Sequence, residues 1–131
     1  MTYINYMEGI MSKIKITYPQ DVELTREQLY RHTVARGTSL KNVDDGTKIS
    51  VKEIVAYEDE KGVKIISILG YEWNEEVNDF DHALSHYASN SSIFREELEK
   101  IVDIFGSTGI EIRVRKIVSK QGRTFVTCEL V

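Results

Sequence analysis

Cysteine and proline are scarce in this chain, with one residue of each among 131. The single cysteine, Cys128, has no partner for a disulfide or for a cysteine-bound zinc ion. Long apolar runs are also missing, because none approaches the ~20 residues that a membrane-spanning helix needs. Residues 1–10 lack the basic start and the apolar stretch of a signal peptide. We therefore expect a cytoplasmic protein without a membrane partner.

Sequence motifs for catalysis and for nucleotide binding are absent. The chain contains no GxSxG, no Walker-type Gly-Lys-Ser/Thr loop, no GxGxxG and no HExxH. His82 and His86 lie close in sequence to Asp79 and Asp81, but their spacing fixes no third metal ligand. We therefore expect no enzymatic activity and no cofactor, with a metal site at these two histidines as the alternative.

An excess of positive charge is missing as well. The 17 lysines and arginines are outnumbered by 21 aspartates and glutamates, and the formal net charge is -4. Proteins that bind polyanions are usually basic, so this balance argues against nucleic acid binding unless the cations gather on one surface. The length and the 41% hydrophobic content suit one soluble globular domain with a substantial core.

Beyond residue 47, β-rich runs alternate with one amphipathic stretch. The β-branched runs predict strands, and apolar residues at helical spacing predict a helix. A slip in the apolar phase between Val51 and Ile54 predicts a bulge in the first strand. In order, the predicted elements are a hairpin of Lys48–Tyr57 and Val63–Leu69, an ambiguous strand or helix at Phe80–Ala88, a helix at Ser92–Phe105 capped by Ser92, and strands at Ile110–Val118 and Arg123–Val131.

This order of elements predicts a fold class. Three strands, a helix and two strands is the order of the OB-fold, a small barrel that often binds oligonucleotides. We therefore expect a mainly β protein with some α-helix, built on a five-stranded OB-fold-like barrel over residues 48–131. Its helix lies between the third and fourth strands.

Residues 1–47 are expected to form an N-terminal tail and a short helical extension. Thr25 followed three residues later by Gln28 is the pattern of a capping box. This pattern predicts a helix over Arg26–Arg36, with Gly37 as its C-cap.

Basic and aromatic residues suggest how such a barrel would bind a nucleic acid strand. Alternation along the fourth strand puts Arg113 and Arg115 on one face. Lysine and arginine supply nonspecific affinity for phosphates, and a base stacked on an aromatic ring contributes ~1–3 kcal/mol. A solvated basic strand and ordinary aromatic packing are the alternative interpretations. The candidate contact residues are Lys48, Lys52, Tyr57, Lys64, Tyr71, Trp73, Tyr87, Arg113, Arg115, Lys120 and Arg123.

Several short runs resemble a known family. They are Ile49-Ser50-Val51-Lys52-Glu53-Ile54-Val55, Gly62-Val63-Lys64-Ile65, Ser89-Asn90-Ser91-Ser92-Ile93-Phe94 and Ser119-Lys120-Gln121-Gly122-Arg123-Thr124-Phe125-Val126-Thr127-Cys128. With these runs, residues 49–131 resemble the small single-stranded DNA-binding proteins of phages and conjugative plasmids of Gram-positive bacteria. The resemblance implies an OB-fold and sequence-nonspecific binding of single-stranded DNA during phage or plasmid DNA replication or transfer. The acidic segment Tyr71–Asp81 is longer than the family pattern.

Two functions from different classes are compatible with these sequence features. The first is the binding of single-stranded DNA. The second is a protein-interaction or regulatory domain that uses the acidic surface of the same barrel. A continuous groove of Arg113, Arg115, Lys120 and Arg123 beside exposed aromatic rings favours DNA, whereas acidic residues that interrupt this groove favour the interaction domain.

The segment Met1–Ser12 is unusually apolar for a free tail. Exposed apolar groups tend to find a partner surface, so we predict that this segment docks on an adjacent subunit and supports self-association. The alternatives are that it packs on its own barrel, or that it is an extension preceding a translation start at Met11.

Overall fold

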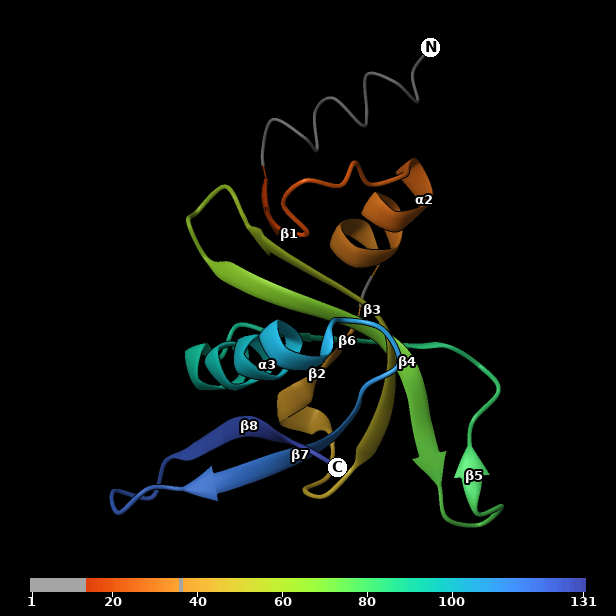
Figure 1. Ribbon diagram of the computed structural model, residues 1–131. Coiled ribbons are helices and arrows are strands. Elements are labelled where there is room, and N and C mark those ends of the chain that lie inside the picture. Colours follow the sequence, from red (N-terminus) through yellow and green to blue (C-terminus); the bar gives the residue numbers. More distant parts are fainter. Residues whose placement is uncertain (1–13, 36) are drawn as a thin grey trace.

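The computed structural model describes residues 14–35 and 37–131 and is mainly β (Figure 1). The predicted self-association segment Met1–Ser12 and the end of the predicted helix at Arg36 lie outside these residues. Within the described residues one eight-stranded sheet curls around the core without closing, and none of their helices is long and apolar enough to cross a membrane. In chain order the elements are β1 (Lys15–Tyr18), α2 (Arg26–Leu29), η1 (Tyr30–Val34), β2 (Thr38–Ser39), η2 (Leu40–Asn42), β3 (Lys48–Glu58), β4 (Lys64–Asn74), β5 (Asp79–Phe80), β6 (Ser85–Ser89), α3 (Ser92–Phe105), β7 (Glu111–Val118) and β8 (Thr124–Leu130).

The predicted hairpin is present as β3 and β4. The two strands pair antiparallel, and their register shifts between Val51 and Glu53, which confirms the predicted bulge. However, β4 continues past Leu69 to Asn74, through residues whose polarity is typical of a loop. Tyr71 and Trp73 therefore lie on a strand, where the pairing with β3 fixes the direction of each side chain.

The ambiguous segment forms the short strands β5 and β6, and the helix α3 has the predicted bounds. Its cap is Ser91 rather than Ser92, because Ser91 has the extended backbone of an N-cap and its Oγ accepts the N–H of Phe94 at 3.2 Å. The Ser91 hydroxyl also donates to the carbonyl of Val126 at 3.0 Å. This one side chain therefore joins the start of α3 to β8.

The strand order is β2-β6-β4-β3-β7-β8, with β1 beside β3 and β5 beside β4. The predicted count of five strands thus covers only part of the sheet, because the N-terminal segments add β1 and β2 and the third predicted segment forms two strands, β5 and β6. β2 pairs in parallel with β6, and the turn that follows η2 reaches β7, where the N–H of Gly46 donates to the carbonyl of Val114 at 2.7 Å. Residues 38–47 therefore run from one edge of the sheet to the other side of the fold. The OB-fold and the boundary between residues 47 and 48 stay predictions.

The predicted capping box is confirmed. The Thr25 hydroxyl accepts the N–H of Gln28 at 3.1 Å, and the Gln28 side chain accepts the N–H of Thr25 at 2.8 Å. After Leu29 the helix widens into the π-helical turn η1, and the chain becomes extended at Ala35. Gly37 is therefore not the C-cap. A Cβ atom at Gly37 would lie 2.9 Å from the His86 ring, so this glycine allows a close approach instead.

The core lies inside the curled sheet and is closed on one side by α3. In Figure 1, α3 lies between the diverging β3–β4 and β7–β8 hairpins. Cys128 belongs to this core, as expected, and burial raises the pKa of its thiol to about 12, so the thiol stays protonated and unreactive. The largest fully buried side chains include Phe94, Leu40, Ile49, Ile68, Leu98 and Ile112.

Candidate nucleic-acid interface

Two cations and two aromatic rings meet where β3 begins. The strand register places Lys48 of β3 opposite Arg113 of β7. The Lys48 Nζ lies 3.9 Å from the centroid of the Trp73 ring. That ring meets Phe80 edge-on, with the ring centroids 5.1 Å apart and an interplanar angle of 82°. A cation over an indole face contributes about 0.5–1 kcal/mol at an exposed site, so these contacts orient Lys48 and Trp73.

The strand register places these side chains on the outer face of the sheet. Ile49 is fully buried, and it pairs with Glu72 on β4 and with Ile112 on β7. Successive side chains point to opposite faces of a strand. The residues directly before and after Ile49, Glu72 and Ile112 in the chain therefore point away from the core. Four predicted contact residues are among them, namely Lys48, Tyr71, Trp73 and Arg113. Arg115 lies two positions after Arg113 and therefore points to the same outer face.

A groove of about 700 Å³ opens beside this group, which is a volume typical of ligand pockets. Its walls come from residues 38–48, the end of β4, the start of β6 and one residue of β7. Of the predicted contact residues it is lined by Lys48, Trp73, Tyr87 and Arg113. It is also lined by the carboxylates of Asp44, Asp45, Glu72 and Glu75. The groove therefore presents both signs of charge to a ligand.

The two arginines of β7 have acidic neighbours. Arg115 Nε donates to Glu129 Oε1 at 2.8 Å, and Arg113 Nη1 lies 3.8 Å from the same oxygen. Arg115 Nη1 also lies 4.0 Å from Asp45 Oδ2. These carboxylates interrupt the predicted basic groove. Exposed pairs of this kind contribute only ~0–1 kcal/mol each, so a phosphate can compete with the carboxylates for the guanidinium groups.

The remaining basic pair lies at the tip of the β7–β8 hairpin. Lys120 and Arg123 are exposed, and Gly122 has the positive φ of 80° expected for this turn. A strand rises ~3.3 Å per residue, which puts this tip about 20 Å from Arg113 along β7. The four predicted cations of the hairpin therefore form two separate groups rather than one continuous cluster.

The other predicted contact residues are spread over the sheet. Lys52 is exposed at the bulge of β3, and Lys64 is exposed at the start of β4 opposite Glu58. Tyr57 lies half-buried at the far end of β3 from Lys48, and burial raises the pKa of its hydroxyl. The structure does not bring Lys52, Tyr57 and Lys64 together with the group around Trp73.

Tyr87 is the one aromatic candidate that belongs to the core. Its register partner is Ile68, which points inward, and only 3% of Tyr87 is exposed. Burial, together with the neighbouring carboxylate of Glu72, raises the pKa of its hydroxyl to about 12. The ring is therefore almost entirely buried, although Tyr87 lines the groove described above, and its role as a stacking residue stays a prediction.

Sequence reasoning missed a chain of buried polar groups that joins η1 to the sheet. Glu53 Oε1 lies 2.6 Å from His32 Nε2, and His32 Nδ1 lies 2.7 Å from the Ser67 hydroxyl. The same hydroxyl lies 2.6 Å from His86 Nε2. The sequence signal was Ser67 itself, which is the one polar residue in the run Ile65-Ile66-Ser67-Ile68-Leu69. Ser67 is fully buried, so the chain of bonds fastens the helix to the sheet rather than presenting a nucleophile.

The two histidines of this network are held in an environment that favours their neutral form. Burial lowers the pKa of His32, although the hydrogen bond to Glu53 acts in the opposite direction. Burial and the nearby His32 ring also lower the pKa of His86. His86 Nδ1 is buried and has no hydrogen-bond partner among the residues described.

The arrangement around Lys48 places two cations, Lys48 and Arg113, beside the Trp73 and Phe80 rings. Tyr71 and Arg115 lie on the same outer face, and Lys120 and Arg123 lie beyond them at the hairpin tip. No protein-family model, curated protein or solved structure matches the chain.

Proposed function

We propose that the protein binds single-stranded DNA without sequence preference on the outer face of β3, β4 and β7. One observation carries this proposal, which is the placement of Lys48 over the Trp73 ring with Arg113 beside it. Bases stack on aromatic rings at ~1–3 kcal/mol each, while lysine and arginine follow the phosphates. Neither contact reads the identity of a base, so the binding is expected to be sequence-tolerant.

The carboxylates beside the arginines limit the affinity of this surface. Arg115 must break its ion pairs with Asp45 and Glu129 before it can bind a phosphate. The free energy of these ion pairs is therefore subtracted from the affinity for the strand. Lys120 and Arg123 have no such neighbour within hydrogen-bonding distance among the residues described. Phosphate contacts are therefore expected first at the hairpin tip and at Lys48.

The order of the strands supports the finer proposal of an OB-fold. β6, β4, β3, β7 and β8 are adjacent in that order, and α3 connects β6 to β7. In this proposal residues 38–47 complete the wall of a five-stranded barrel. A cytoplasmic location, a role in phage or plasmid DNA replication or transfer, and self-association through Met1–Ser12 are further parts of the proposal.

The proposal is tested by the fluorescence of the single tryptophan. Trp73 is the only tryptophan of the chain, so its emission reports the groove directly. Titration with oligo-dT is expected to quench this emission, and the anisotropy of a labelled oligo-dT is expected to rise in parallel. The variant Lys48→Gln/Arg113→Gln should bind several-fold more weakly. The matched control Lys61→Gln/Lys100→Gln removes the same charge from two exposed sites away from the groove.

One observation favours the second candidate, a protein-interaction or regulatory domain. Glu129 and Asp45 partly neutralise the basic strand, and the groove itself contains four carboxylates. If oligo-dT leaves the Trp73 emission and the anisotropy unchanged at low salt, nucleic acid binding is wrong and the interaction domain is the better proposal.

A further inference from the structure

The apolar side chains on one side of α3 form a stripe that becomes exposed to solvent toward the end of the helix. Phe94 and Leu98 are fully buried, whereas Val102 is only partly buried and Phe105 is 56% exposed. The spacing of these residues keeps them on one side of the helix. The same apolar stripe is therefore buried at the start of α3 and exposed to solvent at its end. Ile104, beside it, is 75% exposed. The last turn of α3 therefore presents apolar surface that the described residues do not cover.

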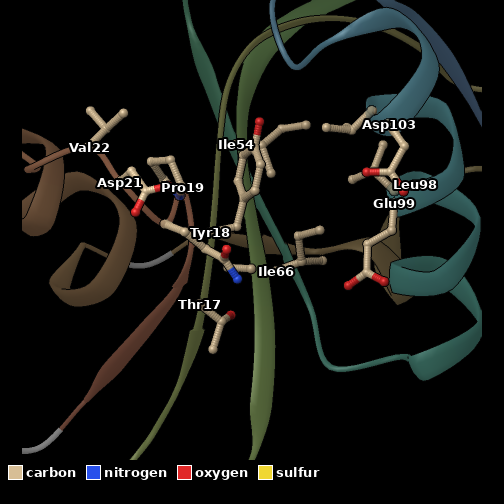
Figure 2. A pocket seen from close by; sticks show the side chains of 13 residues that line it. Thr17, Tyr18, Pro19, Asp21, Val22, Ile54, Ile66, Leu98, Glu99 and Asp103 are labelled. Carbon is tan, nitrogen blue, oxygen red and sulfur yellow. The ribbon is translucent and has the colours of Figure 1, made fainter.

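A groove of about 560 Å³ adjoins the middle of this stripe, between α3 and the loop that follows β1 (Figure 2). Figure 2 shows Tyr18, Pro19 and Val22 on the loop side, with Leu98 on the helix side. The floor is formed by β3 and β4 side chains that are almost entirely buried, including Ile54 and Ile66. Such a floor accepts one or two inserted apolar side chains rather than a broad flat surface.

The rim of this groove is acidic. Asp21 lies on the loop side, and Glu99 and Asp103 lie on the α3 side (Figure 2). No lysine or arginine lines the groove among the residues described. Asp21 and Asp103 form no ion pair within that part of the chain, and Glu99 pairs with Arg95, whose Nε lies 3.9 Å from Glu99 Oε1. Three carboxylates thus surround an apolar floor with little local compensation.

The apolar floor and the acidic rim together indicate which kind of partner can bind this groove. The carboxylates repel phosphates, so a nucleic acid strand does not suit the groove. A second copy would place the acidic rim against an identical acidic rim, which like-charge repulsion opposes. Residues 1–13 contain one glutamate and one lysine, so they carry no positive surplus to match the rim. A segment with apolar side chains flanked by lysine or arginine matches both the floor and the rim.

We propose that the surface formed by this groove and the exposed end of α3 binds a basic amphipathic segment of a partner protein. The segment inserts apolar side chains beside Leu98 and Val102, and its cations face Asp21, Glu99 and Asp103, as in other helix-in-groove complexes. Within the described part of the chain, this surface shares no lining residue with the groove at Lys48 and Trp73. The two surfaces can therefore be occupied together.

The test uses a fluorescein-labelled synthetic peptide of leucine and lysine, with leucine at positions i, i+3, i+4 and i+7. Two related peptides replace every lysine by glutamate or every leucine by serine. Anisotropy with the full chain is expected to rise only with the leucine–lysine peptide. The variant Asp21→Asn/Glu99→Gln/Asp103→Asn should weaken that binding about tenfold. Phe105→Ser changes an exposed residue, so it should fold normally and weaken binding about fivefold.

Matched controls separate this site from general attraction to an acidic protein. The variant Glu27→Gln/Glu60→Gln/Glu76→Gln removes the same charge from exposed sites outside both grooves and should bind the peptide as the parent does. An equal loss in both triple variants overturns the proposal, and so does unchanged binding in the groove variant. A dimer in solution that Phe105→Ser dissociates would assign the surface to a second copy and also overturn it. Loss of oligo-dT binding in the groove variant would assign the surface to nucleic acid, with the same consequence.

Discussion

At the scale of single residues, the Ser67 hydroxyl determines how the helical segment is held. Glu53 accepts a hydrogen bond from His32 Nε2, so neutral His32 offers Nδ1 as an acceptor to the Ser67 hydroxyl. The same hydroxyl then accepts the Nε2–H of His86. Both histidines therefore depend on one side chain of β4, although His32 lies in η1 and His86 lies on β6.

Replacing Ser67 with alanine tests this dependence. The change leaves His32 Nδ1 and His86 Nε2 without their partner in a buried site. Unpaired buried polar groups cost about 1–3 kcal/mol, so Ser67→Ala should lower the free energy of unfolding by that amount. Urea unfolding followed by circular dichroism measures it. The exposed Ser92→Ala should change stability by less than about 0.5 kcal/mol, and equal effects would contradict the assigned role.

The lowered pKa values of His32 and His86 predict how stability depends on pH. Well above pH 6.5 both histidines are neutral in the folded and the unfolded chain, so their contribution is constant. Below pH 6.5 the unfolded chain binds protons more readily, and the free energy of unfolding should fall until the pH passes the folded-state pKa. Around His32, Glu53 opposes this trend, whereas Arg31 adds to it.

Chemical unfolding at pH 7.5, 6.5 and 5.5 measures this trend. The variant His32→Gln/His86→Gln should be less stable at neutral pH, but it should lose less stability between pH 6.5 and pH 5.5 than the parent. The same slope in parent and variant would assign the acid sensitivity to other groups.

At the scale of elements, Ser91 joins a helix to a strand. Its Oγ caps α3 at Phe94 and donates to the carbonyl of Val126 on β8. Loss of an N-cap costs ~0.5–2 kcal/mol, and the bond to β8 adds to that cost. Ser91→Ala should therefore lower the unfolding free energy by about 1–2 kcal/mol. Thermal and urea unfolding compare it with Ser92→Ala, and a larger loss in the Ser92 variant would restore Ser92 as the cap.

Elements defined by local signals could be predicted from the sequence. The capping box at Thr25, the bulge after Val51 and the bounds of α3 all depend on residues close together in the chain, and all three are confirmed. The continuation of β4 through Trp73 could not be predicted, because pairing with β3 overrides the polar composition. The contact of residues 38–47 with β6 and β7 also depends on partners distant in sequence.

The candidate site was predictable in part for the same reason. Alternation along one strand placed Arg113 and Arg115 on the same face, and the structure agrees. Whether a carboxylate lies beside them depends on the register of β8, which brings Glu129 opposite Arg113. The register of β6 likewise turns Tyr87 into the core. Neither register follows from the sequence of its own strand.

At the scale of the whole molecule, charge is distributed over two surfaces of opposite kind. The outer face of β3, β4 and β7 presents Lys48, Arg113 and Arg115 in the neighbourhood of aromatic rings. Among the residues described, the charged side chains that line the groove beside α3 are all carboxylates. A net charge of -4 therefore does not describe either surface. A nucleic acid strand and a basic protein segment would be recognised by separate regions of the fold.

This separation predicts the salt dependence of oligo-dT binding. Counterions released from a single strand give a slope of log affinity against log salt of ~0.7 per neutralised phosphate. Replacing Arg113, Lys120 and Arg123 together with alanine should weaken binding to all sequences alike and reduce that slope by up to about 2. Because Glu129 already holds Arg113, the pair Lys120→Ala/Arg123→Ala should account for more of the change than Arg113→Ala. Anisotropy titrations at several salt concentrations measure each slope. An unchanged slope in the triple variant would show that these cations form only a solvated surface and that any strand is bound elsewhere.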